Sequence, residues 1–289
     1  DNGMKVFIGT VTTGACLSVI SQTKADNMFQ ITPSASAAKV IANDNCFQVC
    51  FTDPNQGTAS ADYIASKGLA TKVAVIYNSS DAYSSGIYDN FKAEAAAKGL
   101  DLVASEAFTG DSKQDFSSQL SKIKASGAEL IFLPIYYQEA SLILSQAKNA
   151  GITAKFFGCD GLDGLLNIEN FDKSLAENVM LLTPFAANAT DETTKKFVAA
   201  YNAKYDPSTL NQFAADAYDA VYVVKAAAEK AGVTGDMSVS DICNALKGAM
   251  TEITVDGVTG SGMTWKATGE VNKEPKAVKI ENGEYQPMD

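Results

Sequence analysis

The chain has 289 residues, of which 46% are hydrophobic and 20% are charged, and its formal net charge is −11. This length exceeds that of a typical single domain, so we expect two lobes. The negative charge disfavours nucleic acid and anionic membrane surfaces as partners, because both would repel the protein. The sequence contains no histidine, which removes the commonest general base and the commonest metal ligand.

The five cysteines show neither a zinc-binding spacing nor a CxxC pair. Cys46 and Cys50 lie in one expected strand at a distance of roughly 13 Å, which is too far for a disulfide between them. We therefore expect all five thiols to be buried and reduced, and we expect no metal and no other cofactor. The cysteines do not indicate in which cellular compartment the protein functions.

Short apolar segments rich in Val, Ile and Phe alternate with Ala- and Lys-rich segments of helical periodicity. We expect strands at residues 5–8, 28–32, 46–51, 72–77, 102–108, 129–135, 155–158 and 179–183. We expect helices between many of them, at residues 14–25, 56–68, 84–98, 114–126 and 137–150. This alternation is typical of βαβ units around a parallel sheet with helices on both faces.

After Pro184 the alternation gives way to helical segments at residues 191–204, 211–231 and 238–248. The chain ends with two apolar segments, at residues 262–266 and 276–280, separated by polar turns that contain glycine. We expect these two segments to be the strands of a terminal hairpin. The sequence contains no flexible linker, so we expect short crossovers between the lobes.

Two hydroxyl-rich turns are the strongest indication of a binding site. Residues 10–14 (TVTTG) and residues 32–36 (TPSAS) each follow a short apolar strand. The free N–H groups, hydroxyls and helix N-terminus of such a turn attract a carboxylate without a buried cation. In consecutive β-α units the two turns would lie side by side at one edge of a parallel sheet, where open α/β sheets bind ligands. The alternative is that these Ser and Thr residues only cap helices.

Further short segments follow these turns in a specific order. With the two turns included, the segments are FIGTVTTG at 7–14, ITPSASA at 31–37, DPNQG at 53–57, DAYSSG at 81–86, YY at 136–137, FGCDG at 157–161 and AYDAV at 217–221. Their order and spacing point to a known family. From residue 5 to the C-terminus the chain resembles the Leu/Ile/Val-binding type of solute-binding protein, the extracytoplasmic receptors of amino-acid ABC transporters. The resemblance implies a two-lobed, type I periplasmic-binding α/β fold, each lobe being a parallel doubly wound sheet with helices on both faces.

The resemblance also implies how the chain divides between the lobes. Residues 1–56 and 185–274 would form the N-terminal lobe, and residues 57–184 and 275–289 the C-terminal lobe. Family members begin with two further β-α units before the segment that opens this chain. We therefore expect the N-terminal lobe to be incomplete here.

By resemblance, the first turn would hold the α-carboxylate of an amino acid. The Thr13 hydroxyl and the backbone of Thr13 and Gly14 would bind the carboxylate, while Val11 and Thr12 would line the wall. A hydroxyl and N–H groups at a helix start suit the lone pairs of a carboxylate.

The second turn and a later carboxylate would hold the α-ammonium. The Ser34 carbonyl and the Ser36 hydroxyl, with Ala35 between them, would accept hydrogen bonds from it, and Asp160 would neutralise its charge. Asp160 directly follows an expected strand, where a buried carboxylate is costly unless it is paired. The alternative is that Asp160 only caps a helix over residues 161–168.

Three aromatic residues match positions that surround the ligand in the family. Tyr83 and Tyr136 would pack their rings over the ligand from the second lobe, and Phe213 would form a hydrophobic wall. For each of them alone, burial in the core is the competing interpretation.

The implied function is that of an extracytoplasmic solute-binding protein which delivers its ligand to an ABC permease. No Arg or Lys occupies a matched position, which favours a neutral L-amino acid, aliphatic and possibly branched-chain in its side chain. We expect a monomer. One alternative is a ligand sensor of the same fold that regulates a partner. An enzyme is disfavoured, because the sequence has no GxSxG elbow, P-loop or GxGxxG motif, and no catalytic residue is expected.

Overall fold

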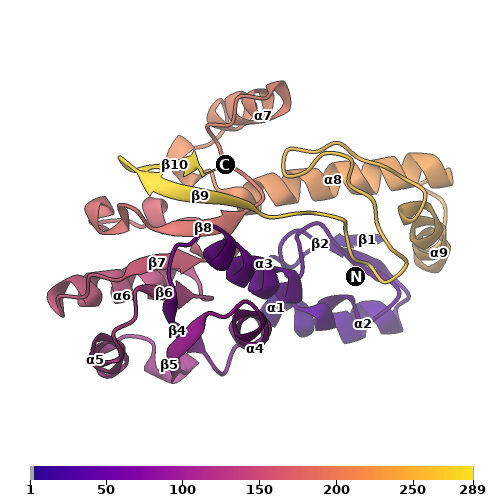
Figure 1. Ribbon diagram of the computed structural model, residues 1–289. Helices are drawn as coiled ribbons and strands as arrows, with labels where there is room; N and C mark the ends of the chain where they lie inside the picture. The colour runs from indigo at the N-terminus through magenta and orange to yellow at the C-terminus, as the bar shows by residue number, and fades with distance from the viewer. Residues whose placement is uncertain (1–2, 289) are drawn as a thin grey trace. The chain divides into compact units, whose positions relative to one another are not determined.

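The computed structural model describes residues 3–288, which form two compact units, and Figure 1 labels most of their helices and strands. Unit 1 consists of the chain up to Thr52, Glu192–Phe197 and Gln212–Glu274. Unit 2 consists of Asp53–Asp191, Val198–Asn211 and the chain from Pro275 onward. The expected lobe bounds differ from these units at residues 53–56, 185–191 and 198–211. The assignment of the chain to lobes stays a prediction.

Unit 1 is built on a parallel sheet with the strand order β1-β2-β3. The strands are β1 (Val6–Ile8), β2 (Phe29–Thr32) and β3 (Cys46–Gln48). The rings of Phe29 and Phe47 stack at 5.3 Å on the face that α8 (Gln212–Ala231) and α9 (Val239–Met250) cover. A second apolar cluster joins α1 (Thr13–Leu17) to the 3-10 helix η1 (Ala38–Ile41).

The expected helix over residues 14–25 is two short helices, α1 and α2 (Ile20–Ala25). The Ser18 hydroxyl donates to the Gly14 carbonyl at 3.1 Å, and the Val19 N–H donates to the carbonyl of Cys16, only three residues earlier, at 3.1 Å. These local bonds replace the regular i to i−4 pattern, so the helix is interrupted between its two halves.

Unit 2 is built on a seven-stranded sheet with the order β10-β9-β8-β7-β6-β4-β5, in which β4 to β8 are parallel (Figure 1). Its strands are β4 (Lys72–Asn78), β5 (Asp101–Phe108), β6 (Leu130–Leu133), β7 (Lys155–Gly158), β8 (Met180–Thr183), β9 (Lys276–Glu281) and β10 (Glu284–Pro287). Its α-helices are α3 (Asp53–Ser66), α4 (Ala82–Ala97), α5 (Ser117–Ser126) and α6 (Tyr137–Asn149). The remaining helices of the chain are α7 (Glu192–Asn202) and the 3-10 helices η2 (Gly110–Ser112), η3 (Asp160–Leu162), η4 (Leu165–Asn167), η5 (Lys173–Ala176) and η6 (Pro207–Thr209).

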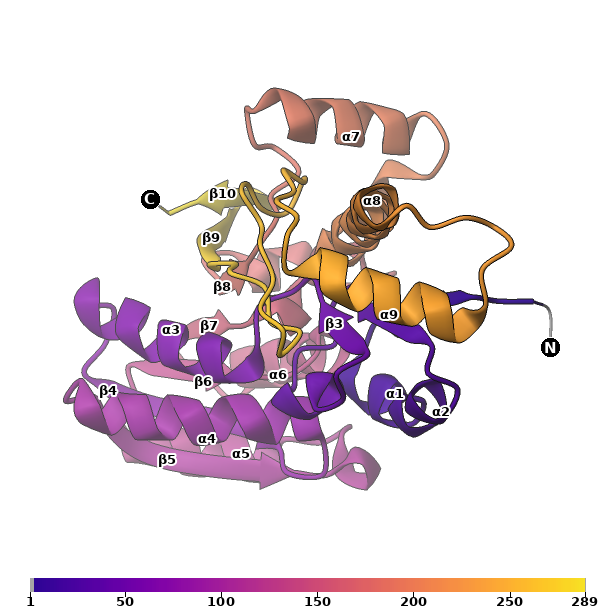
Figure 2. The same ribbon diagram turned by 90° about the vertical axis from the view of Figure 1, so that its right-hand side faces the viewer.

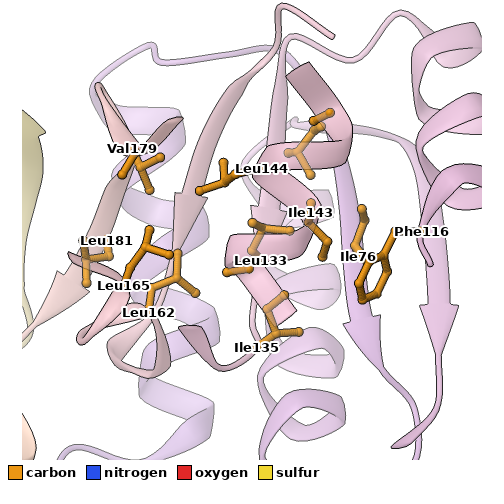
Figure 3. Packing of buried hydrophobic residues seen from close by; sticks show 14 of the residues in the cluster. Ile76, Phe116, Leu133, Ile135, Ile143, Leu144, Leu162, Leu165, Val179 and Leu181 are labelled. Carbon is orange, nitrogen blue, oxygen red and sulfur yellow. The ribbon is translucent and has the colours of Figure 1, made fainter. Parts of the chain in front are cut away.

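Successive residues of β4 point to opposite faces of the sheet, and both faces are buried. Val73 and Val75 pack in the cluster that α3 and α4 complete, whereas Ile76 packs with α5 and α6. Figure 3 shows the second cluster, in which Leu133 and Ile143 meet beside Ile76. Burial on both faces explains why these strands are continuous apolar runs in the sequence.

The expected terminal hairpin between residues 262–266 and 276–280 is wrong. β9 pairs antiparallel with β8 and with β10, both in unit 2. Met263 instead forms a bridge with Val255, and Trp265 forms one with Val271. The Trp265 ring is buried in unit 1, where its Nε1 donates to the Gln48 carbonyl at 2.8 Å. Packing of this ring, rather than strand alternation, decides where the segment lies.

The five cysteines are all buried and free, as expected. Between residues 3 and 288 no helix has the length and apolarity of a membrane span. The same residues contain no group of His, Cys, Asp and Glu side chains suited to hold a metal ion.

Candidate functional site

The two hydroxyl-rich turns of unit 1 lie next to each other after β1 and β2. The Thr13 hydroxyl oxygen accepts hydrogen bonds from the backbone N–H groups of Ser36 and Ala37, both at 3.3 Å. The Thr32 hydroxyl donates to the Thr10 carbonyl at 2.6 Å. The expected juxtaposition of the turns at the carboxyl edge of the sheet is therefore present in unit 1.

These hydroxyls do not cap helices. The N-cap of α1 is Thr12, whose side chain makes no capping hydrogen bond, and the N-cap of η1 is Ala37. Thr13 lies inside α1 and uses its hydroxyl to hold the second turn. The alternative that the Ser and Thr residues of the turns serve only as caps is wrong for both helices.

The two turns differ in exposure. In the second turn Ser34, Ala35 and Ser36 are buried, whereas in the first turn Val11 is 42% exposed. Thr12 and Gly14 are exposed, and Thr13 is buried. Phe213 is half-buried in the first turn of α8.

Within the second turn, the side chain of Ser36 has incomplete hydrogen bonding. Its hydroxyl is buried and has no hydrogen-bond partner among the described residues. A buried polar group in this state costs about 1–3 kcal/mol. A ligand atom that bonds to the Ser36 hydroxyl would recover part of this free energy.

In unit 2 the structure brings together Tyr83, Tyr136 and Asp160. Tyr83 lies in the first turn of α4, Tyr136 precedes α6, and Asp160 follows β7. The Tyr83 hydroxyl donates to Asp160 Oδ1 at 2.6 Å, and its oxygen accepts from the Gly161 N–H at 2.9 Å. The rings of Tyr83 and Tyr136 stack with their centroids 4.8 Å apart. Tyr83 is only 2% exposed, so its clearest role is to hold Asp160.

Asp160 is a buried carboxylate with neutral hydrogen-bonding groups among its neighbours. Burial raises the pKa of Asp160 to about 6, and hydrogen bonding by Tyr83, Gln56 and the Gly161 backbone opposes this rise. Burial also raises the pKa of Tyr83 well above its usual value, so the Tyr83 hydroxyl keeps its proton and donates. Asp160 is therefore ionised at neutral pH at an energetic cost, which a cationic ligand group would reduce.

Asp160 does not cap a helix over residues 161–168. It is the first residue of η3, whose N-cap is Cys159, and a separate short helix, η4, follows. Gly164 separates the two with a φ of 107°, a conformation that interrupts a right-handed helix. The alternative role considered for Asp160 is therefore wrong.

A cavity of about 230 Å³ opens beside Tyr136 within unit 2. It lies at the carboxyl ends of β4, β5 and β6, where sheets of this kind bind ligands. Besides Tyr136 its walls include Asp81, Lys113 and Glu139, and the last two form an ion pair at 3.3 Å. Burial raises the pKa of Asp81. Sequence reasoning did not identify this cavity.

Sequence reasoning also missed Gln56, which contacts Asp160. Its Oε1 accepts a hydrogen bond from the Asp160 N–H at 3.3 Å. The available signal was the DPNQG segment, which supported the resemblance but received no role.

The family profile and the relatives that match this chain describe the same kind of binding protein. A family profile described as "Periplasmic binding protein" matches residues 1–284. The "Leu/Ile/Val-binding protein homolog 3" of Brucella melitensis is 33% identical over 81% of this chain and 63% of its own length. The "Leucine-, isoleucine-, valine-, threonine-, and alanine-binding protein" of Pseudomonas aeruginosa is 28% identical over 85% of this chain and 65% of its own length. The chain thus spans slightly less than two thirds of these two relatives.

Solved structures share the fold over almost the whole chain. A leucine binding protein, LivK, from Thermotoga maritima has a TM-score of 0.86 at 26% identity and is matched over 99% of this chain and 79% of its own. LivJ from Streptococcus pneumoniae, solved in complex with isoleucine, has a TM-score of 0.83 at 27% identity, over 98% and 78% of the two chains. A solute binding protein from R. palustris in complex with benzoate has a TM-score of 0.85 at 19% identity, over 98% and 76%, which indicates the fold alone.

The expected α/β fold is confirmed by these structures, by the parallel sheet of unit 1 and by the parallel strands β4 to β8 of unit 2, to which β9 and β10 add an antiparallel edge that the sequence did not predict. The family consists of binding proteins rather than enzymes, in agreement with the sequence. By the family match and by its relatives, the chain belongs to the periplasmic binding proteins of the Leu/Ile/Val-binding type.

Proposed function

We propose that the chain is the solute-binding component of an ABC transporter and captures a neutral L-amino acid, with the branched-chain amino acids in its range. The observation that carries this proposal is the buried Asp160 carboxylate. The groups that bond to it include Tyr83, Gln56 and the Gly161 N–H, which are neutral. A ligand ammonium would stabilise its buried negative charge.

The turns of unit 1 would bind the rest of the amino-acid backbone. The Ser36 hydroxyl, which is buried and unpartnered among the described residues, would bond to the ammonium. The hydroxyl and backbone of Thr13 and the N–H of Gly14 would bind the carboxylate. Since none of the proposed contact residues is Arg or Lys, the site favours a neutral side chain.

Relatives of the same fold make an aromatic acid the second candidate ligand. One solved relative is in complex with benzoate and another with 4-hydroxybenzoate, at 19% and 16% identity. Benzoate carries a carboxylate but no ammonium, so an ionised Asp160 would repel it. The Asp160 geometry therefore supports the amino acid.

The family also supports the proposed cellular context. We propose an extracytoplasmic protein that acts as a monomer and delivers its ligand to the membrane permease. The ligand would favour the conformation for which it has the higher affinity.

The test is calorimetric titration of L-isoleucine into the purified chain and into a Thr13→Ala/Asp160→Ala variant. We expect the wild type to bind and the variant to lose binding, with unchanged far-UV circular dichroism. Asp101→Ala, which alters an exposed carboxylate at the start of β5, serves as the control and should bind normally. Tight binding by the double variant would contradict the assigned site.

A further inference from the structure

The DPNQG segment opens α3 and places Gln56 against Asp160. Gln56 is fully buried, and its Oε1 accepts from the Asp160 backbone N–H at 3.3 Å. Its Nε2 group is also buried and has no hydrogen-bond partner of good geometry among the described residues. A buried amide donor in this state is costly, so the position of Gln56 calls for a function.

Gly57 explains how Gln56 reaches this position. A Cβ atom at Gly57 would lie 2.5 Å from the Ile87 carbonyl oxygen and 2.8 Å from the Phe91 nitrogen. Glycine thus lets α3 approach the backbone of α4 closely, and Figure 2 shows the two helices beside each other. Since α3 carries Gln56 and α4 carries Tyr83, this contact sets both side chains relative to Asp160.

Gly161 completes the arrangement. A Cβ atom at Gly161 would lie 2.6 Å from the Tyr83 hydroxyl oxygen and 2.6 Å from the Ile135 carbonyl oxygen. The absence of a side chain allows the Tyr83 hydroxyl to accept from the Gly161 N–H while it donates to Asp160. Asp160 is therefore held on its backbone side by Gln56 and on its carboxylate side by Tyr83.

The charge state of Asp160 depends on these neighbours. Burial raises the pKa of its carboxyl, and the Gln56 side chain is among the groups that lower it. Removing the Gln56 amide should therefore shift the titration of Asp160 toward higher pH.

We propose that Gln56 is a positioning residue for amino-acid binding: its Oε1 accepts from the Asp160 N–H and fixes the residue whose carboxylate receives the ligand ammonium. This inference rests on the proposed function, because the ammonium is the assigned partner of Asp160. Gln56 itself need not touch the ligand.

The test separates the effect on Asp160 from ligand binding. The carboxyl pKa of Asp160 is measured in the ligand-free protein by carbon NMR with labelled aspartate, and the Asp160→Asn variant assigns the signal. In Gln56→Leu the pKa of Asp160 should rise by about one unit. Gln48→Leu is the matched control, since Gln48 is also a fully buried glutamine but lies in β3 of unit 1. This control should leave the pKa of Asp160 unchanged.

Binding of L-isoleucine provides the second readout. Because only ionised Asp160 attracts the ammonium, Gln56→Leu should weaken binding roughly tenfold near pH 5 and much less near pH 8. Gln56→Met, which retains the length of the side chain, replaces Gln56→Leu should the latter fail to fold. An unchanged pKa of Asp160 in the folded variant would overturn the proposal. A shifted pKa together with no isoleucine binding by the wild type would support the role of Gln56 and contradict the proposed function.

Discussion

Replacing Asp160 by Asn should make the ligand-free protein more stable at neutral pH while it abolishes ligand binding. Asn has nearly the same size, and its side-chain carbonyl can still accept the hydrogen bond from Tyr83 that Asp160 Oδ1 accepts at 2.6 Å. The substitution removes only the negative charge, whose burial is unfavourable in the absence of a ligand.

The magnitude follows from the pKa of Asp160, which burial raises from 3.8 to about 6. Because the folded-state pKa lies above the unfolded value, the folded chain binds more protons between these two pH values. Stability contributed by protonated Asp160 is therefore fully present below pH 3.8 and is lost as the pH rises through about 6. A pKa that is higher by roughly two in the folded state corresponds to about 3 kcal/mol of unfolding free energy.

The assay is urea unfolding of both proteins without ligand at acidic and at mildly alkaline pH. The unfolding free energy of Asp160→Asn minus that of the wild type should increase by about 2.5 kcal/mol from pH ~4 to pH ~8. Comparing the same two proteins at both pH values cancels any constant effect of the amide on packing. A difference that stays constant with pH, or that shifts in favour of the wild type, would refute the reasoning.

Three further substitutions test the fold and the site, each with a control. Thr13→Ala should lower the unfolding free energy by about 1–3 kcal/mol and weaken isoleucine binding, because two buried N–H groups lose their acceptor. The control Thr13→Ser keeps the hydroxyl and should retain both stability and binding, measured by urea unfolding and by calorimetric titration. Gly57→Ala should lower the unfolding free energy by about 1–3 kcal/mol, measured in thermal melts, because the added methyl group would clash with α4. The control Gly248→Ala adds a methyl group in open space in α9 and should leave stability unchanged or raise it. Lys273→Met should lower the unfolding free energy in urea by about 3–5 kcal/mol, because it leaves the buried carboxylate of Asp216 without its ion-pair partner. Lys266→Met, which removes an exposed ion pair with Glu270, should change the unfolding free energy by less than about 0.5 kcal/mol. Equal effects of the two substitutions would contradict the role of burial.

The strands of unit 2 were predictable because their physical cause is local. The run from Val73 to Ile76 is apolar at every position, since both faces of the sheet are covered, and such runs mark buried parallel strands. The partner of Trp265 was not predictable, because extended backbone does not reveal which core will bury the ring. The break near Ser18 depends on hydrogen bonds that the helical periodicity does not encode.

The candidate site was predictable only in part. Topology places Tyr83 and Asp160, which are 77 residues apart, at the same carboxyl edge of one parallel sheet, and the resemblance supplied their identity. The contact of Gln56 with Asp160 could not be predicted from the sequence. A glutamine near the start of a helix is normally a surface residue, and the two residues are 104 positions apart in the chain. The burial of Gln56 depends on the close approach of α3 to α4, which only the folded structure shows.

The role of Asp160 in ligand recognition is tested by the affinity of the purified chain for L-leucine and for 4-methylpentanoate, which has the same carbon skeleton without the ammonium group. If Asp160 and Ser36 recognise an ammonium, L-leucine should bind with one-to-one stoichiometry, and 4-methylpentanoate should bind roughly a thousandfold more weakly. Benzoate should be rejected for the same reason. Equal or tighter binding of either acid would show that the ligand is not an amino acid and would contradict the assigned role of Asp160.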